Sequence, residues 1–141
     1  MELDIWQVVW ATGLASIVWF IVGGALYMNP VVRGIYNQFD TLPIMKQWPS
    51  VSQYLGIMFL GAGLAQCFLA ALAFALIKPA LPDSILGTVA VFGFILISIK
   101  IFTRFFDMWI QTTYPTKLLV IEFVNGSIGS LVIATIFALA I

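Results

Sequence analysis

Four long apolar runs constrain this chain more than any other feature of its sequence. They cover residues 5–27, 54–77, 84–106 and 118–141, and all six prolines lie between them. A helix needs about 20 mostly apolar residues to cross the hydrocarbon core of a bilayer. Backbone groups in lipid must be hydrogen-bonded within the protein, and continuous runs satisfy this as helices rather than as barrel strands. The sequence therefore predicts an all-α membrane protein, a four-transmembrane-helix bundle that forms one domain over residues 1–141.

The composition supports a membrane location and argues against a nucleic-acid partner. Hydrophobic residues make up 62% of the chain and charged residues 9%, whereas soluble domains have about 45–50% and about 25%. The six basic and six acidic residues cancel, so no nucleic acid is expected as a partner. The expected partners are the lipid bilayer and either further copies of the chain or a larger membrane complex.

The side chains that most catalytic and metal sites require are missing from the sequence. There is no histidine and only one cysteine, Cys67, which lies inside an apolar run. Histidine is the usual general base and the commonest metal ligand, and one thiol builds neither a disulfide nor a four-cysteine metal site. We therefore expect no enzymatic activity, no catalytic residues, no metal and no cofactor, and we interpret Cys67 as a packing residue.

Lysine and arginine positions predict the orientation in the membrane, because cytoplasmic loops are enriched in these residues. The first loop contains Arg33 and Lys46, and the third junction contains Arg104 and Lys117. The second loop contains only Lys78. We therefore expect the first and third loops in the cytoplasm and both termini outside.

The first loop is long enough to hold a short helix of its own. Asn29 is a good helix cap and Pro30 suits a first helical turn. Val31, Ile35 and Phe39 then recur every four residues, which is typical of a helix lying in the membrane interface. Such a helix anchors the two neighbouring spans, or alternatively forms a gate or a docking element.

A cluster of charged residues lies near the cytoplasmic boundary of the last two spans. Lys100, Arg104 and Asp107 are four and three residues apart, so an α-helix places them on one face. Glu122 lies five residues past Lys117, about 7 Å inside the span by helix rise, and Asn125 follows one turn later.

The last two spans are expected to be antiparallel neighbours, so a pair between Glu122 and Lys100 or Arg104 is geometrically natural. Charges within a span are costly and are usually paired or functional. Three interpretations stay open: a structural ion pair, a polar site for an ion, proton or small ligand, and contact with anionic lipid headgroups.

Polar and small residues elsewhere in the spans allow similar alternatives. Gln66 lies midway along the second span, where its amide needs either one interhelical hydrogen bond or a place in a pore. Small residues let helix backbones approach closely, or alternatively they line a ligand cleft. They are Gly13, Gly23, Gly24, Gly56, Gly61, Ala62, Gly63, Gly126, Ser127, Gly129 and Ser130.

Two short segments resemble a known family. Residues 22–27 read Val-Gly-Gly-Ala-Leu-Tyr and are followed by Asn29 and Pro30, while residues 111–119 join the last two spans through Pro115 and Lys117. This pattern resembles a family of small bacterial and fungal membrane proteins known only as a domain of unknown function, although Leu26 stands where that family has tryptophan. The resemblance implies four spans and a bacterial inner membrane, and it implies no biochemical activity.

Three functions follow as hypotheses from these residues. The first is a small structural or accessory membrane protein, without enzymatic activity, that forms homo-oligomers or joins a larger complex. The second is an oligomeric small transporter or channel with a polar site around Glu122, Lys100 and Arg104. The third is a protein that binds anionic lipid.

Overall fold

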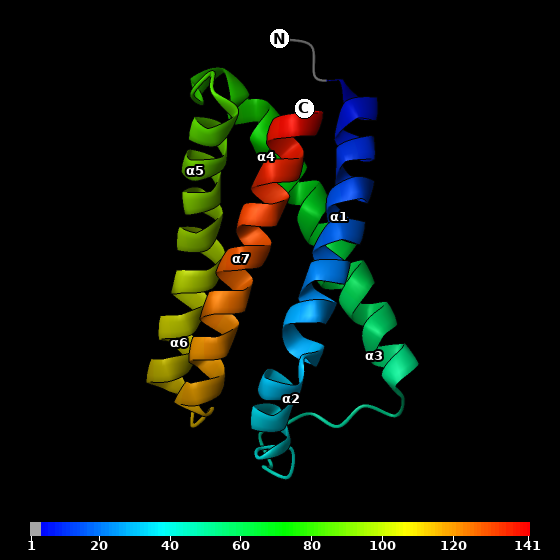
Figure 1. Cartoon of the computed structure of the whole chain (residues 1–141), viewed down its shortest axis with the longest axis vertical. Helices are drawn as coiled ribbons and strands as arrows, with labels where there is room; N and C mark the ends of the chain where they lie inside the picture. Colours follow the sequence, from blue (N-terminus) through cyan, green and yellow to red (C-terminus); the bar gives the residue numbers. More distant parts are fainter. Residues whose placement is uncertain (1–3) are drawn as a thin grey trace.

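The computed structural model describes residues 4–141, and every regular element in this part of the chain is a helix. Four helical rods are long enough to span a membrane, and Figure 1 shows how they are arranged. The first span is α1 (Ile5–Met28), and α2 (Pro30–Asn37) follows it. The second span joins α3 (Val51–Ile57), η1 (Met58–Ala65), α4 (Gln66–Ile77) and the turn η2 (Lys78–Ala80). The third joins α5 (Ile85–Leu96), η3 (Ile97–Phe102) and α6 (Thr103–Gln111), and the fourth is α7 (Thr116–Ala140).

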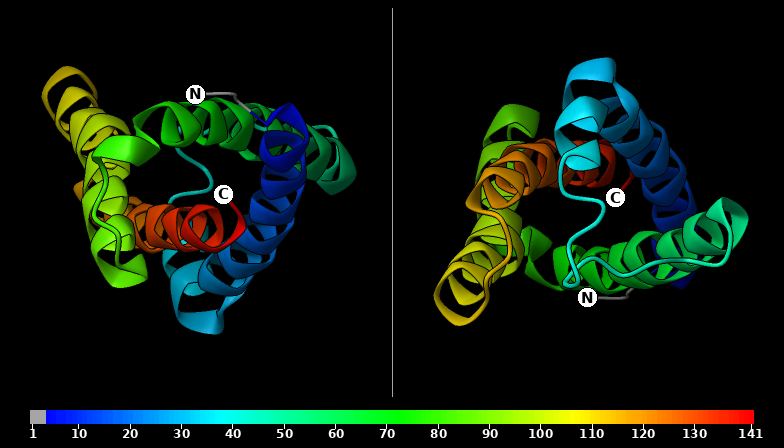
Figure 2. Two further views of the ribbon diagram at one scale, coloured as in Figure 1. Left: turned by 90° about the horizontal axis from the view of Figure 1, so that it is seen from above. Right: turned by 90° about the horizontal axis from the view of Figure 1, so that it is seen from below.

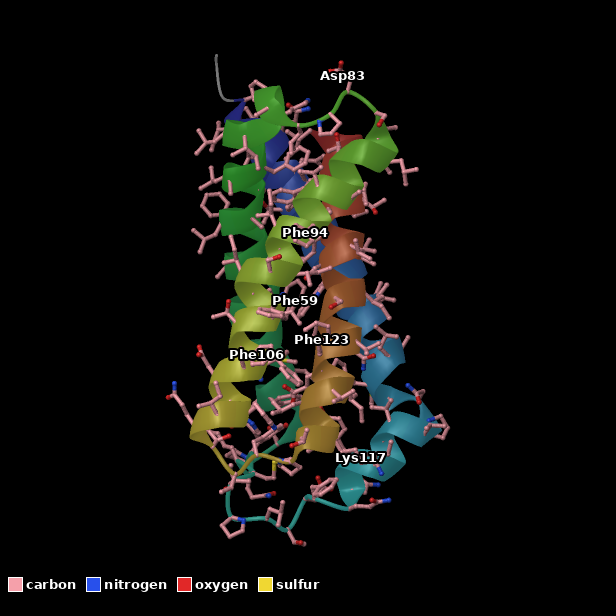
Figure 3. All side chains as sticks on the ribbon, turned by 90° about the vertical axis from the view of Figure 1, so that its left-hand side faces the viewer. Phe59, Asp83, Phe94, Phe106, Lys117 and Phe123 are labelled. Atoms are coloured by element: carbon pink, nitrogen blue, oxygen red, sulfur yellow. The ribbon has the colours of Figure 1, made fainter. Side chains whose placement is uncertain are left out.

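All four rods are long and apolar enough to cross a membrane. This confirms the predicted fold class and fits a small multi-pass integral membrane protein. The first turn of α1 and the last turn of α7 lie at one end of the bundle, here called the terminal end (Figure 1). The opposite end contains α2 and the turn at residues 112–115, and we call it the hairpin end. Figure 3 shows Asp83 at the terminal end and Lys117 at the hairpin end.

The predicted short helix in the first loop is present as α2. Asn29 caps it, because the Asn29 Oδ1 accepts a hydrogen bond from the Val32 N–H at 3.0 Å, and Pro30 occupies the first turn. The Asn29 cap thus separates α1 from α2 without an intervening loop. The location of α2 in the membrane interface stays a prediction.

The second and third helical rods are longer than the apolar runs that predicted them. The second covers Val51–Ala80 instead of 54–77, and the third covers Ile85–Gln111 instead of 84–106. Ser50 starts the second rod earlier by accepting a hydrogen bond from the Gln53 N–H at 3.1 Å. Apolar runs underestimate both helices because backbone hydrogen bonding continues through polar residues at the ends of a span.

Two π-helical segments interrupt the second and third rods, and the sequence did not predict them. They are η1 and η3, in which the backbone bonds from i to i+5. In the third rod this winding separates Lys100, inside η3, from Arg104 and Asp107, on α6. The prediction that these three residues share one face assumed a regular α-helix from Lys100 to Asp107. The structure has a π-helical segment at Lys100, so this assumption is wrong.

The helices pack in the order second, first, fourth, third. The first span contacts both the second and the fourth, and the third packs along the fourth, whereas the second and third barely touch within residues 4–141. Figure 2 shows the consequence: the second rod crosses the bundle obliquely, so that α3 and α6 diverge at the hairpin end. The second and third spans therefore diverge at the hairpin end, whereas Phe74 and Phe92 bring them into contact at the other end.

The densest packing is at the terminal end. The rings of Phe74, Phe92 and Phe137 come from three different spans, and their centroids lie 4.9 to 6.2 Å apart. Small residues, among them Ala15 and Cys67, are fully buried beside them. The interpretation of Cys67 as a packing residue is confirmed, because the thiol side chain lies inside this core.

The predicted role of glycine in helix packing holds for only part of the set. A Cβ atom on Gly126 would lie 2.7 Å from the Ile101 Cδ1, and one on Gly129 would lie 2.9 Å from the Trp19 Nε1, so both glycines permit close contact with another span. Five of the other glycines make no such contact with another span of the same chain, because a Cβ there would meet no atom within 4 Å. They are Gly13, Gly23, Gly24, Gly56 and Gly61.

Candidate functional site

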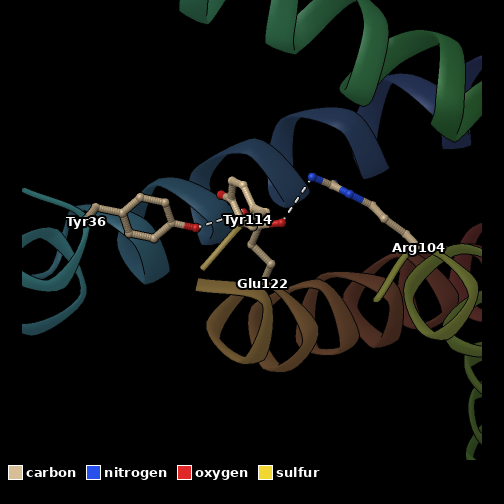
Figure 4. A network of polar contacts seen from close by, with 4 residues as sticks. All are labelled: Tyr36, Arg104, Tyr114 and Glu122. Atoms are coloured by element: carbon tan, nitrogen blue, oxygen red, sulfur yellow. Dashed lines mark hydrogen bonds and ion pairs between the residues drawn. The ribbon is translucent and has the colours of Figure 1, made fainter. Parts of the chain in front are cut away.

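The Glu122 carboxylate is the centre of the largest polar network in residues 4–141. Its Oε1 accepts hydrogen bonds from the Tyr36 hydroxyl at 3.1 Å and from the Tyr114 hydroxyl at 2.5 Å. Its Oε2 accepts one from the Arg104 Nη2 at 3.0 Å. Figure 4 shows how the three donors approach the carboxylate from different elements. We call these four residues the Glu122 network.

The fold brings these side chains together from three separate segments. Tyr36 is in the last turn of α2, Arg104 is in the first turn of α6, and Tyr114 lies in the turn that leads into α7. Glu122 is in the second turn of α7 and its side chain is only 18% exposed, compared with 63% for Arg104. The network therefore ties α2 and the last hairpin to one carboxylate at the hairpin end.

Both tyrosines act as neutral donors in this arrangement. Burial, and next the neighbouring Glu122 carboxylate, raise the pKa of Tyr36. Burial also raises the pKa of Tyr114, as does its hydrogen bond to Glu122. An ionised tyrosine would lose its donor hydrogen and repel the carboxylate, so both hydroxyls stay protonated at neutral pH.

These raised pKa values predict how stability depends on pH. Below about pH 10, tyrosine is protonated in both the folded and the unfolded chain. Above it, the unfolded chain releases the tyrosine protons first, so the free energy of unfolding falls as pH rises. The slope cannot exceed about 1.4 kcal/mol per pH unit for each tyrosine, because each hydroxyl releases a single proton. Unfolding in detergent micelles at a series of pH values measures this decline.

The matched variant for this titration is the double change Tyr36→Phe and Tyr114→Phe. It keeps both rings and removes both titrating hydroxyls, so its stability should fall less steeply above pH 10 than that of the wild type. Identical alkaline slopes for the two proteins would contradict the assignment of raised pKa values to Tyr36 and Tyr114.

The other predicted site residues do not join this network. Lys100 does not pair with Glu122; its Nζ lies 5.8 Å from the centre of the Trp19 ring. Asp107 is exposed, and it forms no ion pair within residues 4–141. Gln66 is the first residue of α4 and is partly buried, away from the Glu122 network. Of the two predicted partners of Glu122, only Arg104 forms the ion pair.

Asn125 lies on the same face of α7 as Glu122, one turn further into the span. It is 9% exposed, and its Nδ2 is buried without a hydrogen-bond partner in the described part of the chain. The other buried polar side chains do bond backbone carbonyls, as the Ser16 hydroxyl does to the Thr12 carbonyl at 2.7 Å and the Thr88 hydroxyl does to the Pro82 carbonyl at 2.6 Å. The Asn125 amide is therefore the exception among these buried polar groups.

Three residues of functional interest were not identified as site residues from the sequence. Tyr114 is eight residues before Glu122, and this proximity along the hairpin was a usable signal. Tyr36 and Trp19 are 86 and more than 100 residues away from Glu122 along the chain, so only the packed structure reveals them. Aromatic residues near span ends are normally interpreted as interfacial anchors.

Neither the metal-binding side chains in the described part of the chain nor a comparison with known proteins points to a further site or to a family. Within residues 4–141 no three His, Cys, Asp or Glu side chains gather closely enough to hold a metal ion. Comparison with protein-family models, curated proteins and solved structures finds no match to this chain. The resemblance to a family of small membrane proteins therefore stays a prediction.

Proposed function

We propose that this chain is a small non-enzymatic membrane protein with a structural or accessory role, and that it self-associates through the hairpin-end half of its second span. The supporting observation is that this half-span packs against the first span but not against the third. Every residue of α3 is exposed. A second copy would supply the neighbour that the bundle itself does not provide.

The exposed half of the second span has the residues that helix association in lipid requires. Gly56, Gly61 and Ala65 are exposed and are five and four residues apart, close to one turn each, and the last two belong to the π-helical segment η1. No atom lies within 4 Å of a Cβ built on either glycine. Between helices in a bilayer, close packing of small residues drives association, so this stripe is suited to contact another helix.

The Glu122 network favours this role over transport through the same residues. Both oxygens of the carboxylate already accept hydrogen bonds from donors within the chain. A transported ion or solute would have to displace an arginine and two tyrosine hydroxyls. The network therefore supports a structural function for Glu122, namely holding α2 against the last hairpin.

Cysteine cross-linking in native membranes tests self-association. In a Cys67→Ala background, Gly61→Cys is expected to give a covalent dimer with a short bis-maleimide. Val124→Cys is the matched control, because it lies at a similar depth on the exposed face of α7 and should stay monomeric. If Gly61→Cys stays monomeric, and photobleaching of the labelled wild-type protein shows single copies, self-association is wrong.

A further inference from the structure

Trp19 occupies the point where all four spans meet. A Cβ on Gly63 of the second span would lie 3.7 Å from the Trp19 Cζ3, and one on Gly129 of the fourth would lie 2.9 Å from its Nε1. From the third span, the Lys100 Nζ lies 5.8 Å from the ring centre. Gly63 belongs to η1 and Lys100 to η3, so both π-helical segments border this ring. Such segments occur frequently at functional sites.

Each of three polar side chains around this ring offers at least one hydrogen-bond donor. Lys100 has three N–H donors and no acceptor capacity, and the indole nitrogen of Trp19 only donates. Within residues 4–141 neither side chain has a hydrogen-bond acceptor. The buried Asn125 Nδ2 also lacks one. Asn125 lies one turn before Gly129, and Gly126 beside it meets Ile101, the neighbour of Lys100. Asn125 is thus on the part of α7 that borders both Trp19 and the helical turn containing Lys100.

No carboxylate in the described chain compensates the Lys100 charge. Both Glu122 oxygens are occupied by the Glu122 network, and Asp107 is exposed on α6. Lys100 is partly buried, 11 residues before the end of α6, which is about 16 Å along the helix. This is deeper than the apolar runs suggested, because the third rod continues past Phe106. An uncompensated ammonium at such depth is costly, so a bound counter-charge would be strongly favoured.

We propose that Lys100, Asn125 and Trp19 form a binding site for an oxyanion inside the bundle. The Lys100 ammonium would supply the charge, and the Asn125 amide and the Trp19 indole would donate to the oxygens. A phosphate or carboxylate group fits this donor set, either as the head of a membrane lipid that enters where the second and third spans diverge or as a free anion. This site does not depend on self-association.

Thermal unfolding of the full chain in nanodiscs tests the site and separates the two sources. One arm compares discs of phosphatidylcholine with discs that also contain phosphatidylglycerol. The other arm adds inorganic phosphate to phosphatidylcholine discs. A higher unfolding temperature in the first arm alone identifies a lipid headgroup, and a saturable rise in the second identifies a free anion. A wild-type protein that responds in neither arm overturns the proposal.

Three variants assign the response to these residues. Lys100→Met keeps an apolar stem of similar length and should weaken anion binding by about tenfold or more, since a charge-assisted hydrogen bond is lost. Asn125→Leu should weaken it less, and Lys100→Arg should retain most of it. Lys117→Met is the matched control, because Lys117 is exposed at the hairpin end and should bind as the wild type does. An unchanged response in both Lys100→Met and Asn125→Leu would also overturn the site.

Discussion

Replacing Phe92 with alanine is expected to lower the free energy of unfolding by about 3 kcal/mol. The Phe92 side chain is 1% exposed and packs edge-on against Phe74, with ring centroids 4.9 Å apart. Phenylalanine-to-alanine changes cost about 3–5 kcal/mol in soluble cores, through lost transfer energy and the cavity left behind. When the wild-type chain unfolds in lipid or detergent, the Phe92 ring still lies in apolar surroundings. This reduces the transfer contribution, so the lower end of the range applies.

Phe94 provides the control for this prediction on the same helix. It is two residues away on α5 but 70% exposed, so it faces the lipid rather than the other spans. Phe94→Ala should therefore change the free energy of unfolding by less than about 0.5 kcal/mol. Reversible unfolding of both variants in mixed micelles makes the comparison. Equal losses would mean that the phenylalanine cluster at the terminal end does not hold three spans together.

The sequence was sufficient to predict the four spans because lipid leaves the backbone few alternatives. Apolar runs located every rod, and Asn29 with Pro30 located the short helix after the first span. The predicted ends were wrong by up to five residues, most clearly at Gln111. Hydrophobicity marks where a chain is buried in lipid, whereas hydrogen bonding and caps such as Ser50 decide where a helix begins and ends.

The polar sites were predictable only as far as helix periodicity holds. Glu122 and Arg104 were placed opposite one another correctly, because each belongs to a regular helix of the last hairpin. Lys100, the alternative partner, lies beside Trp19 instead and belongs to η3, whose winding differs from that of α6. Tyr36 reaches Glu122 only after α2 packs against the last hairpin, and no local pattern reports a contact across 86 residues.

Replacing Glu122 with alanine is expected to destabilise the hairpin end by about 2–3 kcal/mol. Removing one partner of a buried ion pair costs about 3–5 kcal/mol, and the exposure of Arg104 reduces this figure. The change also leaves the Tyr36 and Tyr114 hydroxyls without their acceptor, which adds the cost of unsatisfied donors. Because Tyr36 is the link from α2 to α7, the loss should be greatest in α2.

Hydrogen exchange of the intact protein in nanodiscs can locate this effect. In Glu122→Ala the amides of α2 should exchange faster, while those of the core around Phe92 at the terminal end keep their protection. Asp107→Ala removes another acidic side chain, exposed and unpaired on α6, and should leave both regions unchanged. Glu122→Gln keeps one acceptor oxygen and should fall between the wild type and Glu122→Ala. If α2 is equally protected in all four proteins, the carboxylate does not fasten it, and packing alone holds the first loop against the bundle.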